Sequence, residues 1–213
     1  MKNVVMGILL IVLIGIGGLV YRNAVEHPSR PIACPLDSKS CPDGSLVARS
    51  GPACEFGACL PPNVSLTDAR ILFALPESFV PAELPDATSI AAYEASVASS
   101  TGSSRIVVRR YAITASSTAL AAIQETAIDG TGQPIPATSF SSSVIGARRF
   151  AIVSIGRFGG VVHTAYYLAR NADVLRFDAI DTSVSNWSDS ELDITSLPAH
   201  AALMKLLTAM QML

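Results

Sequence analysis

The sequence predicts an α+β protein with an N-terminal transmembrane helix, a small disulfide segment, and an antiparallel sheet covered by helices. Three features predict it: an apolar run at the start, four cysteines clustered before residue 60, and alternating strand-like and helix-like segments afterwards. They divide the chain into a membrane anchor over residues 1–21, a juxtamembrane linker with a four-cysteine segment over 22–63, and a globular domain over 64–213.

The apolar run extends from Val4 to Val20 and contains no charged residue. As a helix of 17 residues it would reach roughly 25 Å, the short end of what crosses a hydrocarbon core. A cleaved signal peptide is the alternative. Small residues at suitable spacing occur only at Gly15 and Gly17, deep inside the run. We therefore expect a retained single-pass anchor in the lipid bilayer.

Four cysteines, Cys34, Cys41, Cys54 and Cys59, lie in a segment rich in Pro and Gly, and the rest of the chain has none. An even, clustered set indicates disulfides formed in an oxidising compartment. Zinc is the alternative, but the tight two-residue spacing of most structural zinc sites is absent, and no histidine lies between the cysteines. Three pairings are possible. Bonds across the segment are favoured, because two local loops would leave its middle unheld. The domain after this segment is therefore expected outside the cytoplasm.

The pattern Cys41-Pro42-Asp43-Gly44-Ser45, followed by Gly51-Pro52 and Cys54-Glu55-Phe56 with Cys59, resembles a cysteine-rich segment of secreted or membrane-anchored bacterial proteins. The resemblance implies an envelope location and no particular activity.

Composition narrows the possible partners. The chain has 213 residues and a net charge of −2, which argues against nucleic acid as a partner because such proteins present a strongly basic face. Arginine outnumbers lysine, twelve to three. Because guanidinium groups form fork-shaped pairs with carboxylates, we expect many of these arginines in fixed surface pairs on strands.

The first half of the domain is expected to hold two strands and a helix between them. Residues 70–75 form a strand that stops at Pro76, and residues 104–114 are β-branched and form another. The Ala- and Ser-rich stretch 87–104 favours a short helix around Ile90 to Val97, with a loop as the alternative.

The second half continues with a helix from Thr118 to about Ile128. Three extended runs follow, over 148–155, 161–169 and 174–181, with short turns that favour antiparallel pairing between neighbours. The last segment is a helix capped by Thr195 or Ser196, whose apolar stripe includes Leu203, Leu206, Met210 and Leu213.

This order of elements is similar to the PsbP/Mog1-type fold, an antiparallel sheet covered by helices. That resemblance implies a protein that binds or stabilises other proteins rather than an enzyme. It concerns architecture alone, and no residue roles are carried over.

One histidine can be placed beside an acid. If the turn between the last two strands is centred on Asn171 and Ala172, Ala165 lies opposite Asp178, and His163 is diagonal to that carboxylate. A general base oriented by an acid has this arrangement, and so does an ordinary surface histidine on a strand.

An acidic loop contains Asp189, Glu191 and Asp193. Calcium prefers such oxygen donors, but the loop lacks the central glycine and closing glutamate of a helix-loop-helix site. A solvated turn is the favoured interpretation, and no metal or other cofactor is predicted.

The sequence therefore favours a single-pass membrane protein of the cell envelope that binds a partner protein or has a structural role without catalysis. One alternative is an envelope hydrolase that uses His163 and Asp178. Another is a pilin-like subunit, which the missing prepilin cleavage motif disfavours.

Overall fold

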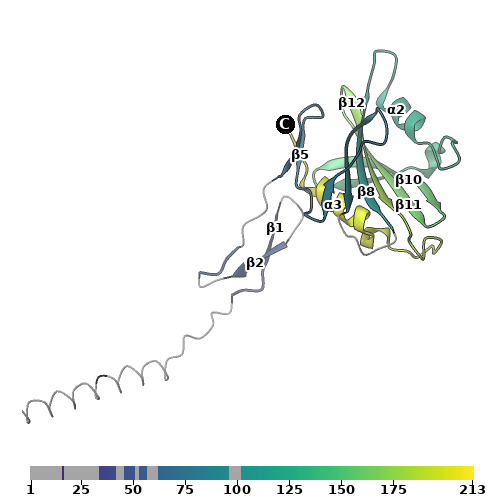
Figure 1. The fold of residues 1–213 in the computed structure, drawn as a ribbon. Coiled ribbons are helices and arrows are strands. Elements are labelled where there is room, and N and C mark those ends of the chain that lie inside the picture. The colour runs from purple at the N-terminus through teal and green to yellow at the C-terminus, as the bar shows by residue number, and fades with distance from the viewer. Residues whose placement is uncertain (1–15, 17–33, 42–45, 51–52, 57–61, 96–101) are drawn as a thin grey trace, which may run out of the picture. The chain divides into compact units, whose positions relative to one another are not determined.

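The computed structural model describes residues 16, 34–41, 46–50, 53–56, 62–95 and 102–213 (Figure 1). The cysteine segment and the C-terminal domain are considered separately. The apolar run from Val4 to Val20 lies outside the described residues apart from Ile16. Within the part of the chain that is described, no helix has the length and apolar character needed to span a bilayer.

The cysteine segment forms a three-stranded sheet of β1 (Ser38–Ser40), β2 (Leu46–Ser50) and β3 (Glu55–Phe56). A disulfide joins Cys34 and Cys54, whose Cα atoms are 5.3 Å apart. The predicted disulfide bonding is thus confirmed for this pair, which bridges the segment instead of closing a local loop. Cys41 is also disulfide-bonded, and Cys59 lies outside the described residues.

An arginine stiffens the same segment. Arg49 Nε donates to Asp37 Oδ1 at 2.8 Å, and its Nη1 donates to the Cys54 carbonyl at 3.0 Å. The guanidinium carbon also lies 4.0 Å from the centre of the Phe56 ring, a distance typical of a cation–π contact.

The domain is built on a seven-stranded sheet in which every neighbouring pair is antiparallel. Its order is β6 (Phe79–Pro81), β7 (Ser89–Ala95), β8 (Ser104–Ala112), β12 (Asp173–Asp181), β11 (Val161–Ala169), β10 (Arg148–Phe158) and β9 (Ser141–Ile145). A smaller sheet has the order β13 (Gln211–Met212), β5 (Ile71–Phe73) and β4 (Val64–Leu66).

Two α-helices lie among the described residues, α2 (Ala119–Thr126) and α3 (Pro198–Ala209), together with the 3₁₀ turns η1 (Ala137–Ser139) and η2 (Ile194–Ser196). Because side chains alternate along a strand, the large sheet has two apolar faces. One packs on α3 and β5 through residues such as Leu206 and Phe177. The other packs on α2 through residues such as Ile123 and Tyr167. Figure 1 shows α3 lying against the sheet near β8.

The prediction of a sheet covered by helices is wrong. The described domain is predominantly β-structure, in which each short helix covers only part of one face. The largest single error is the helix expected within 87–104, where the structure has strand β7. Alanine favours helices in isolation, but here Ala91, Ala92 and Tyr93 are buried in a strand between β6 and β8. Pairing with neighbouring strands therefore overrides the intrinsic preference.

The last helix differs from its prediction at both ends. Thr195 and Ser196 lie in η2, and the N-cap residue of α3 is Leu197, whose side chain makes no capping hydrogen bond. The helix ends at Ala209, so Leu213 lies beyond it and is exposed. The predicted stripe is confirmed for Leu203 and Leu206, which are buried, and Met210 is buried at the C-cap position.

Candidate functional site

The hairpin of β11 and β12 has the predicted register. Ala165 pairs with Asp178 and Tyr167 with Arg176, and the strands turn around Asn171 and Ala172. This register brings His163 Nε2 to 2.7 Å from Asp178 Oδ1. The predicted contact between the histidine and the acid is confirmed.

Asp178 is fully buried and is held by two arginines as well. Arg176 donates from Nε to Oδ1 at 2.8 Å, and Arg109 Nη1 donates to Oδ2. Burial by itself raises the pKa of Asp178, but the hydrogen bond from His163 and the charges of Arg176 and Arg109 outweigh it and lower the pKa below its ordinary value. The carboxylate therefore stays ionised.

The outer ends of these arginines have partners too. Arg176 Nη1 donates to the Thr126 carbonyl at 2.5 Å, at the end of α2, and its guanidinium lies 5.5 Å from the centre of the Tyr167 ring. Arg109 Nη2 lies 2.9 Å from Asp86 Oδ2. The group is a connected set of charges that fastens α2 and the segment before β7 to the sheet.

This geometry gives His163 no neighbouring nucleophile to activate among the described residues. Among the described residues its ring hydrogen-bonds only to Asp178, and no serine, threonine or cysteine there is placed as a nucleophile for it to activate. The arrangement satisfies a buried carboxylate, while a catalytic histidine and acid also need a nucleophile or an open pocket.

His200, at the start of α3, has two hydrogen-bond partners that the sequence does not indicate. Its Nδ1 lies 2.7 Å from Asp181 Oδ2, and its Nε2 lies 3.0 Å from Thr164 Oγ1. His200 is fully buried, and Thr164 is only 4% exposed. Because Asp181 comes from β12 and His200 from the first turn of α3, no spacing along the sequence could have paired them.

Two carboxylates of the acidic loop accept hydrogen bonds from backbone N–H groups in local turns. Asp189 Oδ1 accepts the Glu191 backbone N–H at 2.9 Å, and Asp193 Oδ1 accepts the Thr195 backbone N–H at 3.0 Å. The described residues contain no group of three or more histidine, cysteine or acidic side chains arranged to hold a metal ion. The loop behaves as a pair of turn caps.

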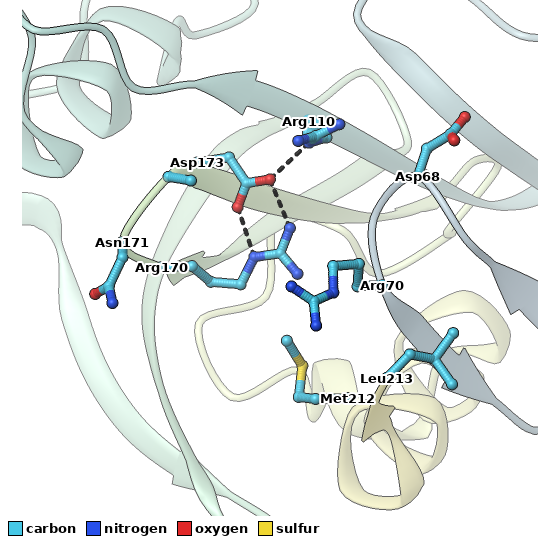
Figure 2. Close-up of a pocket in the computed structure, with 9 residues that line it drawn as sticks. Asp68, Arg70, Arg110, Arg170, Asn171, Asp173, Met212 and Leu213 are labelled. Carbon is cyan, nitrogen blue, oxygen red and sulfur yellow. Dashed lines mark hydrogen bonds and ion pairs between the residues drawn. The ribbon is translucent and has the colours of Figure 1, made fainter.

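A pocket of about 480 Å³ opens where β5, β8, β12 and β13 meet (Figure 2). It is lined by Asp68, Arg70, Arg110, Arg170, Asn171, Ala172, Asp173, Met212 and Leu213. We call it the arginine pocket. In Figure 2 the guanidinium groups of Arg70 and Arg170 face the same central space, whereas Asp68 and Asn171 lie at its edge.

Two of the three arginines share one buried acid. Arg170 contacts both oxygens of Asp173, at 2.5 Å from Nε and 2.6 Å from Nη2, and Arg110 Nε donates to Oδ2 at 2.6 Å. Burial raises the pKa of Asp173. The hydrogen bonds from Arg170 and Arg110 lower it by more, so the net shift of the pKa is downward. Arginines were expected to pair with carboxylates at the surface of strands. Here Arg110 lies on β8, but Arg170 lies in the turn and their shared partner Asp173 is buried.

Arg70 is different. It has a left-handed backbone conformation, with φ at 52°, and its side chain makes no ion pair or hydrogen bond with any residue in the described ranges. The pocket thus holds more positive than negative charge at its centre, beside the apolar side chains of Met212 and Leu213. The sequence analysis did not predict the arginine pocket. Its one indication in the sequence was that Arg170 and Asp173 flank the hairpin turn.

Comparisons with known proteins add little. No family model matches the chain, and no curated protein matches it. Among solved structures, a crystal structure from Bacteroides thetaiotaomicron VPI-5482 is similar at a TM-score of 0.43 and 11% identity. The match covers 68% of this chain and 45% of the other, so this chain spans less than half the length of that protein. A likeness at this level carries no argument about function, and both resemblances noted from the sequence stay predictions.

Proposed function

We propose that this chain is an envelope protein held at the cell membrane by its apolar N-terminal run. Its domain lies outside the cytoplasm and binds an acidic segment of a partner protein without catalysis. The observation that carries the proposal is the guanidinium of Arg70 in the arginine pocket, which pairs with no residue in the described part of the chain. The Cys34–Cys54 disulfide supports the oxidising location.

The chemistry of the pocket suits a carboxylate with an apolar neighbour. Arginine binds carboxylates through two parallel N–H donors, which gives both strength and direction. The Arg110 Nε atom donates to Asp173, and the Arg110 side chain is 39% exposed, so its terminal nitrogens have no partner among the described residues. Met212 and Leu213 provide apolar contact for the rest of such a residue.

A hydrolase that uses His163 and Asp178 has less support. Asp178 is already saturated by His163, Arg176 and Arg109. Neither His163 nor Asp178 lines the arginine pocket. Replacing His163 by alanine should therefore leave partner binding unchanged.

The test uses full-length protein in detergent and a fluorescent hexaglutamate peptide, with hexaglutamine as the uncharged control. We expect the glutamate peptide to bind, and the double variant Arg70→Ala, Arg110→Ala to weaken binding at least about tenfold, the loss of roughly 1.4 kcal/mol. Arg149→Ala is the matched control, because Arg149 is exposed on β10 and lines no part of the arginine pocket.

Equal binding of the two peptides would refute the proposal, and so would an unchanged affinity in the double variant. Anchoring is tested separately by extracting membranes with carbonate. A protein released from the membrane by that treatment would contradict the proposed attachment without bearing on the pocket.

A further inference from the structure

A second pocket, of about 290 Å³, is rich in hydroxyl groups. It is lined by Ser139, Ser141, Ile152, Val153, Ser154, Arg157, Val162, Thr164 and Ile194. We call it the hydroxyl pocket. Four of these side chains carry a hydroxyl, one is an arginine, and none is a carboxylate. Its lining shares no residue with the arginine pocket.

Arg157 is the residue that needs explanation. Its Nε and Nη2 atoms are buried and have no hydrogen-bond partner, and no ion pair joins Arg157 to a described residue. By contrast, Arg109, Arg110, Arg170 and Arg176 all contact an aspartate. A buried donor that lacks a partner costs roughly 1–3 kcal/mol, and more when it is charged. The native protein therefore gains from anything that satisfies this guanidinium.

A β-bulge places Arg157 on the face of β10 that borders the hydroxyl pocket, and Arg157 lines both this pocket and a neighbouring one that includes Asp129. Ser154 pairs with Thr164, but the next pairs are Gly156 with His163 and Arg157 with Val162. The extra residue, Ile155, shifts the alternation by one, so that Arg157 comes to the same face as Ser154 and Thr164. A regular strand would point Arg157 to the opposite face. Bulges that reorient a side chain in this way are common next to functional sites.

The two unpartnered nitrogens define the ligand's shape. The Nε–H bond and one Nη2–H bond of a guanidinium point in parallel from one edge, the arrangement that binds two oxygens of a carboxylate or phosphate. The hydroxyls of Ser139 and Ser154 donate to no described residue, and Ser141 Oγ makes only a 3.4 Å contact with the Ile152 carbonyl. They are available to the remaining oxygens of such a group.

We propose that the hydroxyl pocket binds a compact oxyanion, either inorganic phosphate or the carboxylate of a small organic acid. Arg157 holds it side-on through Nε and Nη2, and Ser139 and Ser154 donate hydrogen bonds to it. Thr164 also lines the pocket, and its Oγ1 contacts His200 Nε2 at 3.0 Å. The ligand therefore sits beside the contact that joins α3 to the sheet, and its binding should stabilise the fold.

The test titrates the full-length protein separately with phosphate and with succinate by calorimetry. Each anion is taken to about 10 mM, where a site with a Kd of about 1 mM is mostly filled. We expect saturable binding of at least one anion and a rise in Tm with its concentration. The anion that saturates the site at the lower concentration, phosphate or succinate, shows which of the two classes of ligand the site prefers. No binding in either arm would overturn the proposal.

Variants test the assignment to Arg157. Arg157→Lys keeps the charge but loses the side-on fork, so the affinity should fall at least about tenfold. The double variant Ser139→Ala, Ser154→Ala alters only exposed residues and should also weaken binding, which covers the case that Arg157→Lys fails to fold. Arg149→Lys is the control on the same strand. Unchanged affinity in a folded Arg157→Lys protein, or in the serine double variant, would refute the site. Replacing Arg70 should leave anion binding intact, so this proposal and the peptide-binding proposal can fail independently.

Discussion

The carboxylate of Asp181 accepts the backbone N–H of Ala199 at 2.9 Å, so the last residue of β12 caps the first turn of α3. The same carboxylate binds His200 Nδ1 at 2.7 Å and the Ser104 hydroxyl at 2.5 Å. A helix normally obtains its N-terminal hydrogen bonds from a residue next to it in sequence. Here the capping residue lies 18 positions away.

Replacing Asp181 by alanine should destabilise the protein by about 3 kcal/mol, because it leaves a buried imidazole and helix N–H groups without their acceptor. Urea unfolding followed by circular dichroism measures the change. Glu191→Ala is the control, since Glu191 is exposed and its replacement should fall within about 0.5 kcal/mol of wild type. An Asp181→Ala protein as stable as this control would show that the capping contact contributes nothing.

Acid should weaken the fold through Asp178. Its folded pKa lies below the ordinary value of about 3.9, because burial, which raises it, is outweighed by His163 and the two arginines. A depressed carboxylate pKa adds stability that is complete above the unfolded pKa and is lost as the pH falls through the folded pKa.

The free energy of unfolding should therefore begin to fall as the pH drops below about 5 and should continue to fall as the pH passes through the lowered folded pKa of Asp178. It should fall less in Asp178→Asn, whose stability is lower throughout. Asp173 and Asp181 also have lowered pKa values, so part of the acid dependence remains in that variant. An identical slope in the variant and the wild type would contradict the role given to Asp178.

The packing of α3 predicts the effect of a buried charge. Leu206 is fully buried against the sheet, so Leu206→Asp should cost several kcal/mol and abolish cooperative unfolding. Its neighbour Lys205 is exposed, and Lys205→Asp should change the free energy of unfolding by less than about 0.5 kcal/mol. Thermal denaturation compares the two. If Leu206→Asp unfolds at the wild-type temperature, α3 is not packed as described.

The disulfide pairing can be read directly. Alkylation of untreated protein should leave Cys34 and Cys54 unlabelled, and mass spectrometry of a non-reduced digest should find the peptides that contain them linked. Reduction should release both peptides. Detection of a Cys34–Cys41 link would contradict the pairing across the segment.

The sequence predicted best those elements that depend on the spacing of apolar residues and on turns between segments close in sequence. The hairpin of β11 and β12 follows from alternating apolar residues on either side of Asn171, and its register places His163 beside Asp178. The final helix was recognisable from its apolar spacing and from Pro198 in its first turn.

Prediction failed where tertiary contacts decide. β7 is a strand because β6 and β8 flank it, which outweighs the helix preference of its alanines. Short strands such as β13 are too brief to produce a period. The arginine pocket assembles residues from three strands, β8, β12 and β13, and from the turns before β5 and β12, and the face on which Arg157 lies depends on a bulge that no sequence pattern indicates.

The charged residues of β12 have a consequence for how the large sheet assembles. Asp173 and Asp181 point to one face of the strand, and Arg176 and Asp178 point to the other. Sliding β12 by a single position would invert its side chains and separate its three aspartates from their partners on other elements: Asp178 from Arg109 and His163, Asp173 from Arg110, and Asp181 from His200. The contact between Arg176 and Asp178 lies within the strand and would move with it. A mispaired sheet would therefore be destabilised by buried charges without partners as well as by the loss of apolar contacts. The ionic groups at the centre of this domain discriminate among competing alignments, a selectivity that a purely aliphatic strand would lack.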